Sequence, residues 1–277
     1  MVLLLVRFFR PSVSARNASR PLLEGLYQGS LADAKEREAQ VSSSKLEQII
    51  ETMSPALDAL TFFQPRESIH VIAEIKRASP SRGDLASIVD PVELAVTYEA
   101  AGASGISVLT EGRKFKGSID DLAAIRPNVS IPLLRKDFIA NEYQLLEARA
   151  NGADIALLIV AGLSQPDLMR LMKFTHDLGM TAFIETHDRQ ELERAMELEA
   201  KFVGVNARDL STFETDRDLF GSLVSLFPAD VVKVAESAVR NAEDVKHYRD
   251  AGADVVLVGE ALVIGDASAT LGSFLRV

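Results

Sequence analysis

The chain has 277 residues and a formal net charge of −10. This length suits one large α/β barrel, which needs about 250 residues, or two smaller domains. The acidic balance argues against non-specific nucleic-acid binding, although a locally basic pocket can still bind a small anionic substrate. The absence of cysteine excludes disulfides, thiol nucleophiles and cysteine-based zinc sites. No apolar run reaches the roughly 20 residues that a membrane helix requires.

The first 20 residues differ in composition from the rest of the chain. A short apolar run is followed by four arginines and several serines, with no acidic residue before Glu24. The run is too short for the hydrophobic core of a signal peptide, and the arginines and serines resemble an organelle transit peptide only weakly. We expect 1–20 to be a disordered tail or the product of an upstream start, and 21–277 to form the barrel and its extension.

Residues 21–60 precede the first predicted strand and have a helical pattern. The serines at 42–44 are expected to cap a second helix that begins near Lys45. We expect this segment to pack on the barrel as an extension, not as an independent domain. Its predicted apolar face consists of Leu31, Ala34, Ala39, Leu46, Ile49 and Ile50.

From Val71 onward, short runs of valine, isoleucine and leucine alternate with longer amphipathic stretches. The runs begin roughly every 20–35 residues, the length of a βα unit, and their continuous apolar character indicates strands of a parallel sheet. The pattern predicts a (β/α)8 TIM barrel, with a doubly wound open sheet as the alternative. The predicted strands are Val71–Lys76, Gly105–Thr110, Pro132–Asp137, Ile155–Val160, Thr181–Thr186, Phe202–Asn206, Val231–Glu236 and Val255–Gly259.

Charged residues gather at the ends of these strands, where the active site of a TIM barrel lies. Buried charges cost several kcal/mol each unless they are paired, so a purely structural role for the whole set is disfavoured. We hypothesise that Lys136 and Glu185 form an acid/base pair. Neighbouring cations would lower the pKa of Lys136, and an apolar neighbour would raise that of Glu185. Lys76 is expected to bind a substrate carboxylate, and the set also includes Glu74, Asn206 and Glu236.

A phosphate site is predicted from loops that follow the first, seventh and eighth strands. TIM barrels often bind phosphate through backbone N–H groups after strands seven and eight, and Gly259 permits a close backbone approach. The first-strand loop contributes Ser79–Gly83. The four histidines lack metal-ligand spacing and no glycine-rich nucleotide motif occurs, so we predict neither a metal site nor a nucleotide cofactor.

Eight motifs, in this order and spacing, resemble those of the indole-3-glycerol phosphate synthase family. The resemblance covers about residues 22–277. The first and third motifs are specific when they occur together, whereas the last is shared by many phosphate-binding barrels. The motifs are VIAEIKRASPSRG (71–83), SVLTEGRKFKGSIDDL (107–122), PLLRKDFI (132–139), ALLIVA (156–161), FIETHD (183–188), VGVNARDL (203–210), VKVAES (232–237) and VLVGEAL (256–262).

The resemblance implies a carboxy-lyase of tryptophan biosynthesis that acts without a cofactor. Its reaction would convert 1-(2-carboxyphenylamino)-1-deoxyribulose 5-phosphate to indole-3-glycerol phosphate by ring closure, decarboxylation and dehydration. Lys136 would be the general acid, Glu185 the base and Lys76 the carboxylate ligand. The other implied residues are Glu74, which orients the lysines; Asn206 and Glu236, on the amine and sugar hydroxyls; Phe115, Phe138 and Leu210, around the aromatic ring; and Ser79, Ser237, Gly259 and the backbone N–H of Glu260, on the phosphate.

We further expect a cytoplasmic monomer or weak homodimer with no nucleic-acid or membrane partner. Ala238 departs from the Glu-Ser-Gly sequence usual in the family; a positive φ at this position would cost an alanine on the order of 1 kcal/mol. Two alternatives stay open. A phosphoribosyl isomerase is disfavoured because those barrels use a cysteine or aspartate pair. A catalytically silent paralogue, which binds a phosphosugar or serves as a subunit partner, is favoured by Ala238 alone.

Overall fold

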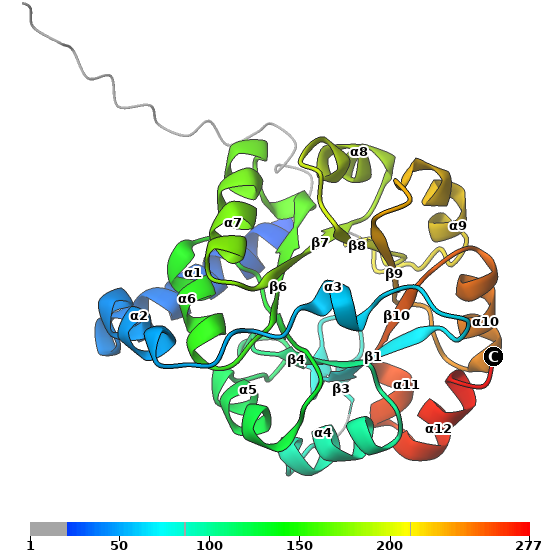
Figure 1. Ribbon diagram of the computed structural model, residues 1–277, viewed down its shortest axis with the longest axis horizontal. Coiled ribbons are helices and arrows are strands. Elements are labelled where there is room, and N and C mark those ends of the chain that lie inside the picture. The colour runs from blue at the N-terminus through cyan, green and yellow to red at the C-terminus, as the bar shows by residue number, and fades with distance from the viewer. Residues whose placement is uncertain (1–20, 86, 211) are drawn as a thin grey trace, which may run out of the picture.

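The sheet is a closed barrel of parallel strands surrounded by helices (Figure 1). The computed structural model describes residues 21–85, 87–210 and 212–277, so the expectations for 1–20 lie outside the described residues. Neighbouring strands are hydrogen-bonded in the order β1-β10-β9-β8-β7-β6-β5-β4. The predicted TIM barrel is confirmed and the open sheet is wrong. The strands are β1 (His70–Ile75), β4 (Gly105–Leu109), β5 (Leu133–Lys136), β6 (Ile155–Ile159), β7 (Thr181–Thr186), β8 (Phe202–Asn206), β9 (Val232–Glu236) and β10 (Val255–Val258).

Each strand end lies within one residue of its predicted position. The differences arise because a strand residue needs a partner on the neighbouring strand. His70 joins β1 because it pairs with Val255 of β10, whereas Gly259 lies beyond the last pair, Ala73 with Val258. A short antiparallel hairpin, β2 (Ala78–Ser79) and β3 (Gly83–Asp84), follows β1 at the carboxyl end of the barrel.

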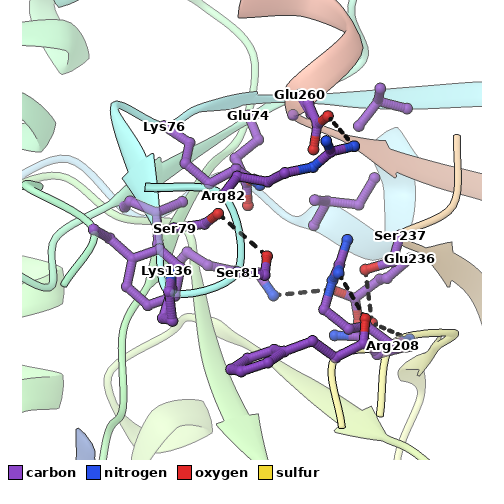
Figure 2. Close-up of a pocket in the computed structure, with 18 of the residues that line it drawn as sticks. Glu74, Lys76, Ser79, Ser81, Arg82, Lys136, Arg208, Glu236, Ser237 and Glu260 are labelled. Atoms are coloured by element: carbon purple, nitrogen blue, oxygen red, sulfur yellow. Dashed lines mark hydrogen bonds and ion pairs between the residues drawn. The ribbon is translucent and has the colours of Figure 1, made fainter. Parts of the chain in front are cut away.

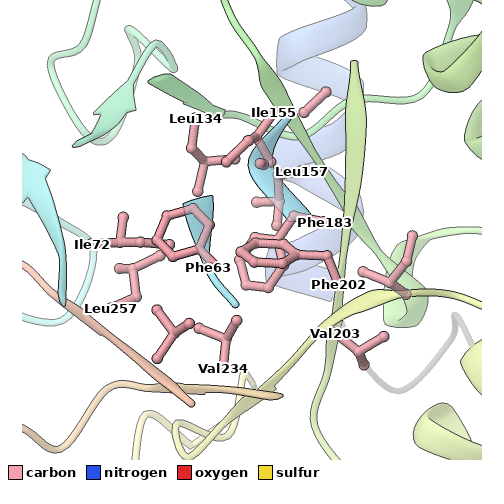
Figure 3. Close-up of a cluster of buried hydrophobic side chains, with 14 of the residues drawn as sticks. Phe63, Ile72, Leu134, Ile155, Leu157, Phe183, Phe202, Val203, Val234 and Leu257 are labelled. Atoms are coloured by element: carbon pink, nitrogen blue, oxygen red, sulfur yellow. The ribbon is translucent and has the colours of Figure 1, made fainter. Parts of the chain in front are cut away.

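Apolar side chains fill the barrel interior (Figure 3). Phe63, just after α3 (Ala59–Phe62), is fully buried among them. Its ring lies 5.3 Å from that of Phe202, the first residue of β8, and 5.6 Å from that of His70, the first residue of β1. Phe63 therefore closes the amino-terminal end of the barrel, and the opposite end is left for the site.

Polar side chains cap the first turns of the helices that follow the strands. Asn141, Ser164, Asp188 and Asn241 each accept a hydrogen bond from a backbone N–H in the first turn, which satisfies a group that the helix cannot pair. Among the described residues, no helix combines the length and apolar character needed to span a membrane. The helices after β3 are α4 (Pro91–Ala100), α5 (Ile119–Ile125), α6 (Glu142–Ala150), α7 (Gln165–Asp177), α8 (Arg189–Glu197), α9 (Leu219–Leu223), α10 (Ala242–Asp250), α11 (Glu260–Val263) and α12 (Ala267–Phe274).

The predicted N-terminal helical segment contains α1 (Pro21–Gln40) and α2 (Ser43–Glu51), and α2 packs on α6. Ser42 caps α2 by accepting a hydrogen bond from the N–H of Lys45, as predicted. The predicted apolar face is wrong at Leu31, Ala39 and Ile49, which are exposed. The buried stripe of α1 lies elsewhere because the first half of the helix rests on the barrel. The stripe consists of Leu23, Leu26, Tyr27, Gly29, Ser30 and Ala34.

Candidate active site

A cavity of about 610 Å³ opens at the carboxyl ends of the strands (Figure 2). Every residue predicted for the site contributes to its lining. The strand ends bring these residues together although they are spread along the chain. They are Glu74, Lys76, Ser79, Phe115, Lys136, Phe138, Glu185, Asn206, Leu210, Glu236, Ser237, Gly259 and Glu260.

Lys136, the last residue of β5, lies between two carboxylates of other strands. Its Nζ donates to Oε2 of Glu185 at 2.6 Å and to Oε2 of Glu236 at 2.9 Å. Both carboxylates are almost completely buried, whereas Lys136 retains some exposure to the cavity. The ammonium is therefore the part of this cluster that a substrate can reach.

The pKa values of this cluster shift in directions opposite to those expected for its acid and base. Burial disfavours the charge of Lys136, but Glu185, Glu236 and Glu74 outweigh it and raise its pKa. Burial likewise opposes ionisation of Glu185, but Lys136 and His187 hold its pKa well below the usual range. The raised carboxyl is Glu236, whose pKa reaches about 8 through burial and the charge of Glu185. The expected directions for Lys136 and Glu185 are therefore wrong, because each has an opposite charge as its nearest neighbour.

The residues that flank Lys136 belong to a buried ion-pair network that fixes its strand. Arg135 is fully buried and pairs with Asp137 at 2.9 Å and with Glu147 of α6 at 3.2 Å. Asp137 also accepts a hydrogen bond from the hydroxyl of Ser30 in α1 at 3.0 Å. The strand alternation thus turns Arg135 toward this network and leaves the ammonium of Lys136 facing the site.

A second lysine–glutamate pair lies at the end of β1. Nζ of Lys76 is 2.5 Å from Oε2 of Glu74. A Cβ atom on Gly259 would come within 2.3 Å of that oxygen and within 2.9 Å of the ammonium. Glycine at 259 therefore leaves the space that the Glu74–Lys76 pair occupies.

Asn206 links the carboxylate of Glu185 to the loop after β9. Its Nδ2 donates to Oε1 of Glu185 at 3.2 Å. Its Oδ1 accepts from the hydroxyl of Ser237 at 2.8 Å and from the N–H of Arg208 at 3.0 Å. Because both ends of the amide are bonded, Asn206 holds one oxygen of Glu185 in a fixed direction.

Aromatic rings form one wall of the cavity. The rings of Phe115 and Phe138 are 6.1 Å apart, and Tyr27 of α1 lies 5.7 Å from Phe138. The buried carboxylate of Glu111 accepts from the N–H of Phe115 at 2.9 Å and thereby fixes the loop that carries this ring. The two phenylalanines, which the family resemblance placed around the aromatic ring of the substrate, line the cavity.

The loops expected to bind phosphate meet at one side of the cavity. Ser237 and Ala238 have φ values of 68° and 55°, so the loop does place an alanine in the left-handed region. The carboxylate of Glu260 is paired with the guanidinium of Arg82 at 3.0 Å. This pairing reduces the repulsion that the carboxylate would exert on a bound phosphate.

Some lining residues are absent from the sequence-based site. Arg208 lies two residues after Asn206, and its place within the VGVNARDL motif was the only signal for it. Arg82 lies in the predicted phosphate loop, but no role was given to its charge. Three leucines of α1 also line the cavity, and nothing in the sequence indicated that the extension would reach the site. They are Leu22, Leu23 and Leu26.

Comparison with known proteins identifies the family. The family model described as indole-3-glycerol phosphate synthase matches residues 23–271. The chain is 56% identical over 253 residues to an indole-3-glycerol phosphate synthase of Leifsonia xyli subsp. xyli, covering 91% of this chain and 97% of that one. It is 52% identical to the protein of the same name from Mycolicibacterium gilvum, covering 88% and 90%.

A similar solved structure at low sequence identity shows the fold alone. N-acetylmannosamine-6-phosphate 2-epimerase from Clostridium perfringens superposes with a TM-score of 0.57 at 16% identity, covering 76% of this chain and 93% of that one. The family model and the two relatives, by contrast, match nearly the whole described chain, and the relatives are 56% and 52% identical to it. The chain therefore belongs to the indole-3-glycerol phosphate synthase family, whose members are carboxy-lyases of tryptophan biosynthesis, as its motifs predicted.

Proposed function

We propose that Lys136, Glu185 and Lys76 carry out the reaction of the family in this cavity. The reaction closes, decarboxylates and dehydrates 1-(2-carboxyphenylamino)-1-deoxyribulose 5-phosphate to give indole-3-glycerol phosphate. The observation that carries the assignment is the pair of Lys136 and Glu185, with Nζ and Oε2 2.6 Å apart at the cavity wall. The raised pKa of Lys136 keeps the ammonium protonated, and the lowered pKa of Glu185 keeps the carboxylate ionised. An acid and a base must enter a reaction in these two forms.

Ring closure needs a carbonyl that protonation has made electrophilic, and Lys136 is the donor. Lys76 binds the carboxylate of the substrate, and Glu74, at 2.5 Å, orients its ammonium. Once the ring has closed, the carboxylate leaves as carbon dioxide and its electron pair returns to the ring. In the dehydration, Lys136, which has regained a proton from solvent after ring closure, protonates the departing hydroxyl while Glu185 accepts the proton that the ring loses.

The remaining lining residues position the substrate. Asn206 and Glu236 hold the amine and the sugar hydroxyls, and Phe115, Phe138 and Leu210 surround the aromatic ring. At the other side of the cavity, Ser79, Ser237, Gly259 and the backbone N–H of Glu260 bind the phosphate. Arg82 offsets the charge of the Glu260 carboxylate there, at 3.0 Å.

A fluorescence assay tests this function directly. The protein contains no tryptophan, so new indole emission after addition of the substrate reports the product alone. Replacing Lys136 by Met or Glu185 by Gln is expected to lower kcat about 10²–10⁴-fold, the usual contribution of a positioned acid or base. The matched control is Lys201→Met, which removes an exposed lysine paired with Asp230 outside the cavity.

Two results would contradict the assignment. Folded wild-type protein that produces no indole emission would favour a catalytically silent relative. Near-normal kcat in Lys136→Met would remove the lysine from the acid role. The cytoplasmic location and the monomer or weak-dimer state stay predictions, and sedimentation of the purified protein at several concentrations tests the second.

A further inference from the structure

His187 follows β7 directly and belongs to the FIETHD motif, but it lies outside the set of residues proposed to bind or convert the substrate. Its side chain is 4% exposed and does not line the cavity. Its Nδ1 lies 3.0 Å from Oε2 of Glu191 in α8, and its Nε2 lies 3.2 Å from Oε1 of Glu185. The imidazole therefore lies behind the proposed base, between two carboxylates, where it cannot touch the substrate.

The two oxygens of Glu185 face different partners. Oε2 accepts from Lys136 at the cavity wall, whereas Oε1 accepts from Asn206 and lies beside His187. Glu191 fixes the imidazole from the other side, since its Oε2 also accepts the backbone N–H of His187 at 2.8 Å. This arrangement anchors the base from behind and leaves Oε2 to face the site.

The contact between His187 and Glu185 is an ion pair whose geometry falls short of a hydrogen bond. Within the described part of the chain, Nε2 is a buried atom without a hydrogen-bond partner. A buried polar atom in this state favours any partner within reach, and the acceptor within reach is Oε1 of Glu185 at 3.2 Å.

The carboxylates on either side of His187 favour its charged form. Burial opposes the charge of His187, but Glu185 and Glu191 together raise its pKa to about 9.

Neighbouring elements also present polar groups near this pair. From α1, the Tyr27 hydroxyl contributes no positive charge, and burial together with Glu185 raises its pKa. From β8, Asn206 is neutral. The guanidinium of Arg194 in α8 donates to the carbonyls of Val160 and Leu163.

We propose that His187 is a positioning residue that orients Glu185 and keeps it ionised when Lys136 gives its proton to the substrate. At that moment the ammonium becomes neutral, and Glu185 would otherwise stand as an unpaired buried carboxylate. The imidazolium then provides the compensating charge and directs Oε2 at the reacting ring. This role rests on the proposed function, since it assumes that Glu185 is the base.

Two substitutions separate the orienting contact from the charge. The amide nitrogen of His187→Gln can reach the place of Nε2, whereas that of His187→Asn can reach only the place of Nδ1. We expect His187→Asn to lower kcat about 10- to 100-fold with little change in KM, because a small misplacement of a reacting group has this effect. His187→Gln should recover most of that loss. Both variants lack the cation, so the acid limb of the kcat–pH profile should move up by about one unit or more in each.

His70→Asn is the matched control, because His70 is also buried but bonds Ser104 and the carbonyl of Gln64 at the start of β1. It should lose stability without moving the acid limb. Should His187→Asn fold poorly, the pH profile of His187→Gln still decides. The positioning role would be overturned if either His187 variant had a wild-type kcat and an acid limb of the kcat–pH profile that had not moved. If the wild type formed no indole, or if Lys136→Met were active, the proposed function itself would be contradicted.

Discussion

Glu236→Gln is expected to change how the stability of the protein depends on pH. In the folded protein the pKa of Glu236 is raised from its ordinary value of 4.5 to about 8, by burial and by Glu185, against the opposing effect of Lys136. A carboxyl with a raised pKa takes up a proton on folding. Its contribution to the free energy of unfolding is therefore fully present below about pH 4.5 and is lost as the pH rises to about 8.

The size of this loss follows from the interval between the two pKa values. Each pH unit corresponds to about 1.4 kcal/mol, so the loss across the interval is on the order of a few kcal/mol. Glutamine has the same shape and no charge, so the variant should lack this loss. The stability of the variant relative to that of the wild type should therefore be greater at about pH 8 than at about pH 5.

Other groups of the cluster do not obscure this comparison. Glu185 has a lowered pKa, so its contribution disappears only on acidification below about pH 4.5. Lys136 has a raised pKa, so its contribution is lost only above the usual lysine range. His187 loses its contribution as the pH rises through about 9, and it does so in both proteins.

The measurement is urea unfolding followed by far-UV circular dichroism at about pH 5, 6.5 and 8. The difference between wild type and variant at each pH isolates the titration of Glu236. The control is Glu243→Gln, which neutralises an exposed carboxylate in the first turn of α10 and should give a difference that does not vary with pH in this range. Parallel stability curves for wild type and Glu236→Gln would refute the reasoning, because Glu236 would then be ionised in the folded protein.

Two further substitutions test the backbone of the site. Ala238→Gly removes the cost of a left-handed alanine at φ 55°, about 1–2 kcal/mol, but adds about 0.4–1 kcal/mol of unfolded-chain entropy. We expect a gain of about 0–1 kcal/mol in thermal unfolding and a KM no higher than that of the wild type; a loss above about 1 kcal/mol would contradict the strain. Gly259→Ala places a Cβ 2.3 Å from Oε2 of Glu74, so kcat/KM should fall at least about tenfold at a stability cost of about 1–3 kcal/mol. Unchanged kinetics would show that the Glu74–Lys76 pair can move aside freely.

The barrel and the location of the site were predictable because both depend on local patterns. Apolar runs at βα spacing fixed each strand to within one residue, and the carboxyl ends of parallel strands must meet at one end of the barrel. Lys136, Glu185 and Glu236 therefore had to lie near one another, although they are far apart in the sequence. Their order around the barrel follows from the strand order alone.

The charge states were not predictable in the same way, because they depend on distances of a few ångströms. Lys136 has carboxylates at 2.6 and 2.9 Å and not a neighbouring cation, which reverses the expected direction of its pKa shift. The role of α1 was hidden for a similar reason. Leu22 and Leu26 have the same apolar character as any buried helical residue, and only the path of α1 across the barrel brings them to the cavity.

Two glycines explain how the cluster accommodates its buried carboxylates. A Cβ on Gly204 of β8 would lie 2.5 Å from Oε1 of Glu236, and one on Gly259 would lie 2.3 Å from Oε2 of Glu74. In each case the missing side chain leaves the space that a carboxylate of the next strand occupies. These two carboxylates pair with the lysines of the site, Glu236 with Lys136 and Glu74 with Lys76, so enlarging either glycine should disturb the chemistry more than the fold.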